Sequence, residues 1–309
     1  MSAVAATLPF GGLHLGEFLP PLVACAVYLA LYARRARTVT RRGSPVPGWR
    51  VTAFLLGAGS AALVQLPPLD SLGDQVLLVH MAQHIWLGDI SSLLIVLGLT
   101  GPMLRPLLTL PWARGMRLLA HPVIALVLWS ADLYAWHVPF LYQLAIRHDL
   151  VHALEHACLL WFGALLWVSL LGPLPKPAWF GGWAKLVHVV GVRVTGAILG
   201  NVLLFVQTVL YPVYTASDSA RGLNPLSDQN LAGAAMMVEQ MVLTAVLLGW
   251  LFVRWVRQDG ERQALLDLAA AHGVALTDER AARAAASGRS TVRLRARLEQ
   301  ERQGERLSG

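Results

Sequence analysis

The sequence contains few charged residues. Asp, Glu, Lys and Arg together make up 14% of its 309 residues, whereas hydrophobic residues make up 56%. Soluble domains average about 25% charged residues, so composition argues against a soluble enzyme or binding domain. Long apolar runs recur along most of the chain, and runs of this kind are typical of membrane-spanning helices. We therefore predict an all-α polytopic membrane protein.

Cysteine and lysine are also scarce. Cys25 and Cys158 are the two cysteines, and they form no CxxC pair, so neither a disulfide framework nor a thiolate metal motif is expected. The two lysines are Lys176 and Lys185, outside every long apolar run. A retinal protein needs a lysine in its last span, so that class is excluded. The first nine residues carry no basic residue, and we expect no cleavable signal peptide.

Seven apolar segments have the length and composition of transmembrane helices. The predicted spans are residues 13–33, 51–67, 75–99, 121–138, 150–171, 189–212 and 230–253. Together they define a predicted transmembrane domain over 1–255. The remainder, 256–309, is predicted to be an Arg-rich cytoplasmic tail that is partly helical or disordered.

The net charge of +7 is distributed unevenly over the connections between these spans. Basic residues gather after the first, third and fifth spans and in the tail, whereas the alternate connections hold only Arg147 and Arg221. This asymmetry indicates membrane topology rather than nucleic-acid binding. The loop-charge rule predicts that the N-terminus lies outside and the C-terminus in the cytoplasm.

Histidines gather at the predicted outer ends of three spans. His80 and His84 lie near the start of the third span, His137 at the end of the fourth, and His152 and His156 near the start of the fifth. Residues four apart share one face of a helix. Ionisable groups within a bilayer usually face the bundle interior and mark a functional site, so we expect these five imidazoles to converge.

The seventh span brings thioethers to a similar predicted depth. Imidazole and thioether ligands together suit copper, and methionine favours Cu(I); imidazole alone would also suit zinc or haem iron. The predicted metal ligands are His80, His84, His137, His152, His156, Met236 and Met237. The carboxylates expected to orient the ligand rings are Asp132, Glu155, Asp228 and Glu239. The alternatives are interhelical hydrogen bonds for the histidines and packing for the methionines.

Four short strings in this order resemble the signatures of a known family. They are His80-Met-Ala-Gln-His84, Trp136-His137-Val-Pro139, His152-Ala-Leu-Glu-His156 and Asp228-Gln229-Asn-Leu-Ala-Gly233. They are similar to those of the seven-span cytochrome c oxidase assembly factors called CtaG, over about residues 10 to 255. The Arg-rich tail departs from a minimal member, and Met237 stands near a position where a tryptophan is expected.

The resemblance implies a multi-pass protein of the bacterial cell membrane that helps to mature a haem-copper oxidase. It implies delivery of copper to the catalytic subunit of that oxidase, with an extracytoplasmic copper donor as a further partner beside membrane lipids. It also implies that the histidines in the matching strings are the functional ones.

Two other functions fit the same residues. A membrane redox protein with b-type haem would use facing histidines as axial ligands, and a copper transporter would continue a path inward through His121 and His188. The spans contain no nucleophile–base constellation, phosphate loop or protease motif, so we predict that the protein is not an enzyme.

Overall fold

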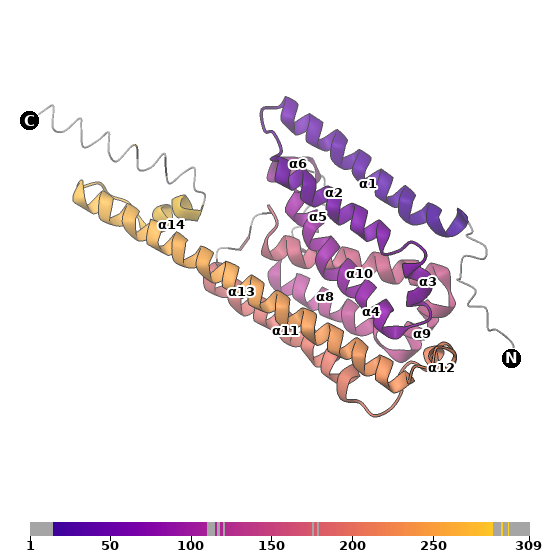
Figure 1. Cartoon of the computed structure of the whole chain (residues 1–309). Helices are drawn as coiled ribbons and strands as arrows, with labels where there is room; N and C mark the ends of the chain where they lie inside the picture. The colour runs from indigo at the N-terminus through magenta and orange to yellow at the C-terminus, as the bar shows by residue number, and fades with distance from the viewer. Residues whose placement is uncertain are drawn as a thin grey trace, which may run out of the picture. The chain divides into compact units, whose positions relative to one another are not determined.

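The computed structural model describes residues 15–109, 121–174, 176, 177 and 179–286, with isolated positions at 115, 118, 119, 292 and 296. Throughout these residues the regular elements are helices, and no strand occurs among them (Figure 1). The predicted all-α class is therefore confirmed for the described part of the chain.

Each predicted apolar segment contains a helix, and short helices fill several connections. The elements in chain order are α1 (Leu15–Arg41), α2 (Gly48–Leu63), α3 (Leu69–Gly73), α4 (Leu77–Ile85), η1 (Trp86–Ser91), α5 (Ser92–Gly98), α6 (Gly101–Leu108), α8 (Pro122–Trp136), α9 (Pro139–Arg147), α10 (Asp149–Leu170), α11 (Gly182–Phe205), η2 (Pro212–Tyr214), α12 (Thr215–Ala220), α13 (Pro225–Ala271) and α14 (Asp278–Ala286). Proline begins both α8 and α9, because its fixed φ and missing N–H suit the first turn of a helix.

Four helical stretches among the described residues are long and apolar enough to cross a membrane. They are Leu77–Gly98, which joins α4, η1 and α5, and the helices α10, α11 and α13. The pair α8 and α9, bent by 69°, provides a fifth if it counts as one span. The protein thus has the helices of a multi-pass membrane protein, but the predicted number of seven is not confirmed.

The helices of the first two predicted spans, α1 and α2, are not among these stretches. Helix α2 has 16 residues, fewer than the roughly 20 needed to cross the hydrocarbon core without distortion. Helix α1 has 27 residues, and Arg34, Arg35, Arg37 and Arg41 lie in its last turns, beyond the predicted span of 13–33. The predicted orientation in the membrane remains a prediction.

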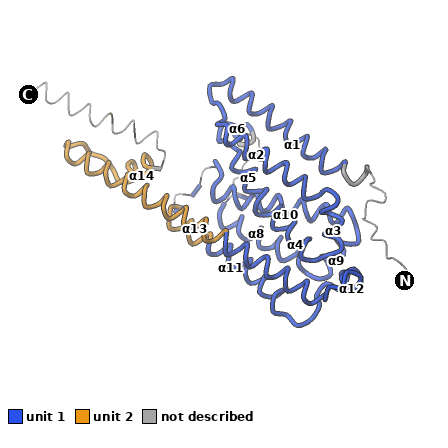
Figure 2. Tube along the Cα trace, in the orientation of Figure 1, with its two compact units in different colours: residues 1–180, 190–242 blue, residues 181–189, 243–309 orange. Residues whose placement is uncertain are grey.

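The chain divides into two compact units (Figure 2). Unit 1 comprises 1–180 and 190–242, and unit 2 comprises 181–189 and 243–309. Helix α13 continues through the predicted domain boundary at 255 as far as Ala271, so the start of the predicted tail is helical. In unit 2, α14 packs on α13 through Leu265, Ala281 and Ala284.

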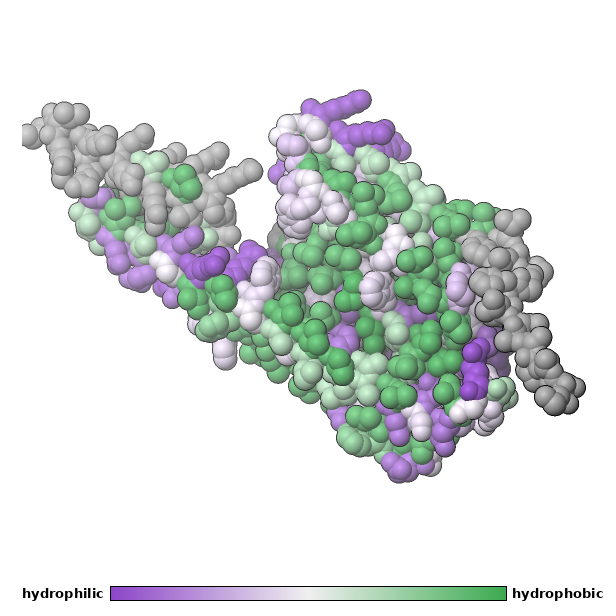
Figure 3. Space-filling view, in the orientation of Figure 1, coloured by the Kyte–Doolittle hydropathy of each residue, from purple (hydrophilic) through white to green (hydrophobic). Residues whose placement is uncertain are grey.

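Large apolar side chains lie exposed along the helices of unit 1. Examples on five helices are Leu31, Leu56, Val127, Trp161 and Ile198. Figure 3 shows apolar residues over most of the face of unit 1 that it presents. Exposed apolar surface of this extent would aggregate in water, and it is the surface expected of helices that contact lipid.

Two arginines bind backbone carbonyls at and just after the end of the Leu77–Gly98 stretch that lies away from the histidines. Arg50 Nη1 donates to the carbonyls of Leu97 and Leu99, at 2.7 and 2.8 Å. Arg35 donates to the carbonyls of Pro102 and Met103. Arg50 satisfies carbonyls at the end of α5 that have no partner within that helix, so the arginine-rich connection and the histidine pair lie at opposite ends of this stretch.

A π-helical segment follows the histidine pair. Residues 86–91 form η1 between α4 and α5, and such segments occur often at functional sites. Helix α10 packs so closely against η1 that a Cβ atom at position 163 would collide with the carbonyl oxygen of Gly88. Glycine at 163 therefore allows the approach that brings α10 alongside α4.

Candidate metal centre

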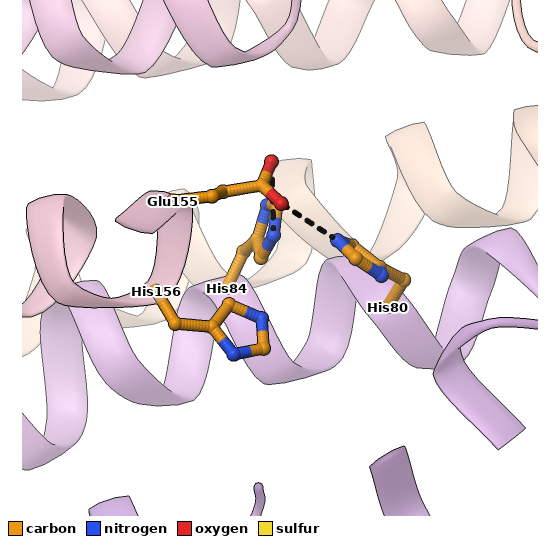
Figure 4. Close-up of side chains that lie close together, drawn as sticks. All are labelled: His80, His84, Glu155 and His156. Atoms are coloured by element: carbon orange, nitrogen blue, oxygen red, sulfur yellow. Dashed lines mark ion pairs between the residues drawn. The ribbon is translucent and has the colours of Figure 1, made fainter. Parts of the chain in front are cut away.

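Four side chains from α4 and α10 converge on one another (Figure 4). His80 and His84 come from successive turns of α4, and Glu155 and His156 from α10. We call these four residues the buried group. Each is buried, and each offers a potential ligand atom within 4.8 Å of those of the others. This is a compact set of three imidazoles and one carboxylate.

The distances within the buried group match those between ligands of one metal ion. His80 Nε2 lies 3.6 Å from Glu155 Oε2, and His84 Nε2 lies 3.5 Å from Glu155 Oε1. These separations exceed the usual hydrogen-bond length of about 2.7–3.2 Å. Two ligands bound tetrahedrally at about 2.0–2.2 Å from one ion would lie roughly 3.3–3.6 Å apart. The spacing therefore fits coordination better than direct hydrogen bonding.

The polar atoms of the buried group have few partners. Both ring nitrogens of His80 and of His84, and both carboxylate oxygens of Glu155, are buried without a hydrogen-bond partner in the described structure. A buried polar atom left unpaired costs about 1–3 kcal/mol, and more when charged. Six such atoms in one place would be costly to folding. A bound cation would satisfy several of them at once, so the residues fit a metal ion.

His137 and His152 lie beside the buried group. The His137 ring centroid is 5.8 Å from that of His84, and the His152 ring stacks on His80 at 5.1 Å. His152 Nε2 lies 3.1 Å from His156 Nε2. The His137 Nδ1 atom donates to the carbonyl of Leu133 at 2.7 Å when that nitrogen is protonated. The structure thus brings together all five histidines that the sequence singles out.

Asp228 fixes the start of the helix that carries the first pair. Its carboxylate accepts hydrogen bonds from the backbone N–H groups of Leu77 and Leu78, at 2.6 and 3.2 Å. These N–H groups have no partner within α4, and a negative charge at a helix start is favourable. Asp228 was expected to orient a histidine ring directly; the contacts that it makes instead position the whole helix.

The other predicted carboxylates lie in different surroundings. Asp132 accepts a hydrogen bond from Trp136 Nε1 at 2.9 Å. Glu239 faces Arg193 rather than a histidine, with 3.1 Å between Oε1 and Nη1. Glu155, expected to orient the rings, has its carboxylate between two of them, where it can itself bind a metal.

The two predicted methionines contact residues outside the buried group. Met236 belongs to an apolar cluster with Leu77, Met81 and Leu203. The Met237 sulfur accepts a hydrogen bond from Asn201 Nδ2 at 3.3 Å. The contacts of Met236 are those of a packing residue, which was the alternative for the methionines, and a role of either methionine as a metal ligand stays a prediction.

Three tyrosines pack beside the histidines, and the sequence patterns do not single them out. Tyr142 lies with its ring centroid 5.2 Å from that of His80, and its hydroxyl is 2.9 Å from that of Tyr214. Tyr211 donates to the carbonyl of His137 at 2.9 Å. Burial raises the pKa of Tyr211 and of Tyr214 above the usual range. Both phenols therefore stay protonated as donors.

Arg193 is a further residue that the sequence patterns do not single out. It lies within α11, where its guanidinium bridges Asp89 at 3.2 Å and Glu239 at 3.1 Å. Gln240 accepts a further hydrogen bond from Nη1. A buried cation needs such partners. This network joins η1, which follows directly after α4, to α11 and α13.

The chain matches the sequence model of the cytochrome c oxidase caa3 assembly factors (Caa3_CtaG) over residues 30–258. The chain belongs to this family. The match includes every residue of the buried group and every other predicted site residue. The resemblance found in the four sequence strings is thus confirmed.

Curated relatives of the chain are longer proteins. An uncharacterized protein of Mycobacterium bovis and another of Mycobacterium tuberculosis are each 26% identical over 257 residues, which cover 76% of this chain and 38% of the relative. An uncharacterized protein of Mycobacterium leprae is 23% identical over 251 residues, covering 75% and 37%. The chain therefore spans less than two fifths of the length of these relatives. No solved structure matches the chain.

Proposed function

We propose that this protein assists the assembly of cytochrome c oxidase by holding a copper ion, as cargo, at His80, His84, Glu155 and His156. The observation that carries the proposal is the set of four buried residues on two helices whose potential ligand atoms lie within 4.8 Å of one another, most of them without a hydrogen-bond partner. Membership in an assembly-factor family supplies the recipient, a haem-copper oxidase.

Copper fits both the donor atoms and the task. Three imidazoles and a carboxylate form a borderline donor set, and copper binds such a set more tightly than the other divalent first-row metals do. The expectation of Cu(I) came from Met236 and Met237. Because Met237 contacts Asn201 and Met236 packs among apolar side chains, the proposed ligands are nitrogen and oxygen, which accept Cu(I) or Cu(II).

The position of the group suits release of the ion. The buried group lies in the first half of the Leu77–Gly98 stretch and in the first half of α10. The arginine contacts are at the other end of the same stretch. By the loop-charge rule, the histidine end faces outward. An ion held there by three imidazoles and a carboxylate can exchange more readily than one in a closed thiolate cage.

The alternative of a haem site finds less support. Neighbouring imidazoles here lie with centroids 4.2–5.8 Å apart, and the Glu155 carboxylate stands between His80 and His84. A haem needs a flat slot between two axial ligands. The imidazole rings instead surround a small volume, which suits a single ion.

Metal analysis of the detergent-purified protein tests the proposal. The wild type is loaded with Cu(I) under reducing conditions or with Cu(II), and is expected to keep one ion per chain after desalting. The His80→Ala/His84→Ala variant should lose it and should lower the oxidase content of membranes. The matched control, His121→Ala/His272→Ala, removes two imidazoles outside the group. It should retain the copper ion and the normal oxidase content of membranes. Full copper retention and normal oxidase in the first variant would overturn the proposal.

A further inference from the structure

A second set of potential metal ligands adjoins the buried group. Asp70, His152 and His156 each offer a ligand atom within 4.8 Å of the others. We call these three residues the shallow group. Asp70 and His152 are partly exposed, whereas His156 is buried and belongs to both groups. Potential ligands therefore extend from the protein surface to Glu155 and His80, which are 0% exposed.

The shallow group is built on a fixed piece of backbone. Asp70 lies on α3, in the connection between α2 and α4. Two hydrogen bonds hold the ends of this connection: Gln83 Nε2 donates to the carbonyl of Val64 at 2.7 Å, and the Tyr214 hydroxyl donates to the carbonyl of Gly73 at 3.2 Å. Since Gln83 belongs to α4, these contacts fix the position of Asp70 relative to the histidines of that helix.

The geometry of His152 links the two groups. Its Nε2 atom lies 3.1 Å from His156 Nε2, and its ring stacks on His80 at 5.1 Å. His152 thus lies against two residues of the buried group and is itself partly exposed. An ion at Asp70 and His152 would already be beside His156.

We propose that Asp70, His152 and His156 form a second, shallower metal site, which passes its ion to the buried group by exchange of ligands on His156. This rests on the proposed function of the buried group. The ion keeps its bond to His156 while its bonds to Asp70 and His152 break and bonds to His80, His84 and Glu155 form. Its oxidation state does not change. Because His156 is shared, the two sites hold one ion between them.

The shallow group has a chemical reason to bind first. Its carboxylate is accessible and negatively charged, so it attracts a hydrated cation. An ion that binds directly at the buried group must lose its bound water in one step. On the proposed path, the ion first exchanges water for the ligand atoms of the shallow group and then exchanges these for the ligand atoms of the buried group. The shallow site is expected to be weak and fast, and the buried site tight.

Loading kinetics with copper ions test this proposal. Purified protein is mixed with Cu(II), and a chelator added after increasing delays separates chelatable from retained ion. Wild type should retain one ion per chain. Asp70→Asn should retain the same amount at equilibrium but load at least about tenfold more slowly, the lower end of the effect of local charge on association. Asp74→Asn, which removes a carboxylate four residues along, should load at the wild-type rate.

A second variant separates the two sites. His80→Ala/His84→Ala should bind one ion that the chelator removes at once, and adding Asp70→Asn to it should abolish that binding. Tight binding by wild type with normal loading in Asp70→Asn would overturn the shallow site and leave the proposed function intact. If wild type bound only copper that the chelator removes, and Asp70→Asn did not bind it, the result would support the shallow site and contradict the buried one.

Discussion

The carboxylate of Asp228 accepts a hydrogen bond from the backbone N–H of Leu77 at 2.6 Å, across 151 positions of sequence. It thereby fixes the first turn of the helix that carries His80 and His84. Asp228→Ala should cost about 1.5–3 kcal/mol, the range for hydrogen bonds to charged groups, and should weaken copper binding about 10- to 100-fold, as other changes outside the ligands do.

Asp228→Asn provides the graded comparison, because its amide oxygen can still accept one N–H. Melting temperature and copper affinity of the purified variants should fall in the order wild type, Asp228→Asn, Asp228→Ala. Wild-type affinity in Asp228→Ala would show that the start of α4 does not depend on this contact.

A methyl group at position 163 should separate the two halves of the site. Gly163→Ala places a Cβ against the carbonyl oxygen of Gly88, so α10 must move away from η1. Overpacking costs about 1–3 kcal/mol, and the shift should lower copper affinity because Glu155 and His156 lie on α10. Thermal unfolding and copper titration measure the two effects.

The control for this variant is Gly59→Ala, on an exposed face of α2 where a Cβ would meet nothing within 4 Å. It should stabilise the protein by about 0.5–1 kcal/mol. Equal behaviour of the two alanine variants would mean that the close approach of α10 to η1 has no part in the site.

Arg193 should be needed for folding rather than for binding copper. Arg193→Met leaves Asp89 and Glu239 buried without their cation, and losing one partner of a buried ion pair costs about 3–5 kcal/mol. Replacing all three, as Arg193→Met/Asp89→Asn/Glu239→Gln, should recover most of the stability. The yield of monodisperse protein and its melting temperature report this, and a triple variant no better than the single one would contradict it.

The seven apolar segments, and the convergence of five histidines, could be predicted from the sequence. Span length, a spacing of four residues and the predicted depth of each residue in its span can be read from local sequence. These properties were enough to predict that His80, His84, His152 and His156 converge. The contacts of Asp228 and Arg193 could not be predicted, because each joins segments 46 or more positions apart. Nor could the role of Tyr142, since the bend between α8 and α9 sets its position against His80.

Glu155→Gln distinguishes a metal ligand from a structural ion-pair partner. The amide removes a buried negative charge whose oxygens have no hydrogen-bond donor among the described groups. The metal-free variant should therefore be at least as stable as metal-free wild type. It should lose most of the gain on copper addition, which is about 2.7 kcal/mol for an ion at 100 times its Kd. A metal-free variant that unfolds at lower temperature would indicate a structural pair with the histidines.

The central claim is that His80, His84, Glu155 and His156 bind one copper ion together. X-ray absorption at the copper edge of the loaded, purified protein tests it most directly. The account predicts nitrogen and oxygen neighbours at about 2.0–2.2 Å, with the outer scattering of three imidazoles, and loss of that pattern in His80→Ala/His84→Ala. A sulfur neighbour near about 2.3 Å, or the same spectrum in the double variant, would contradict it.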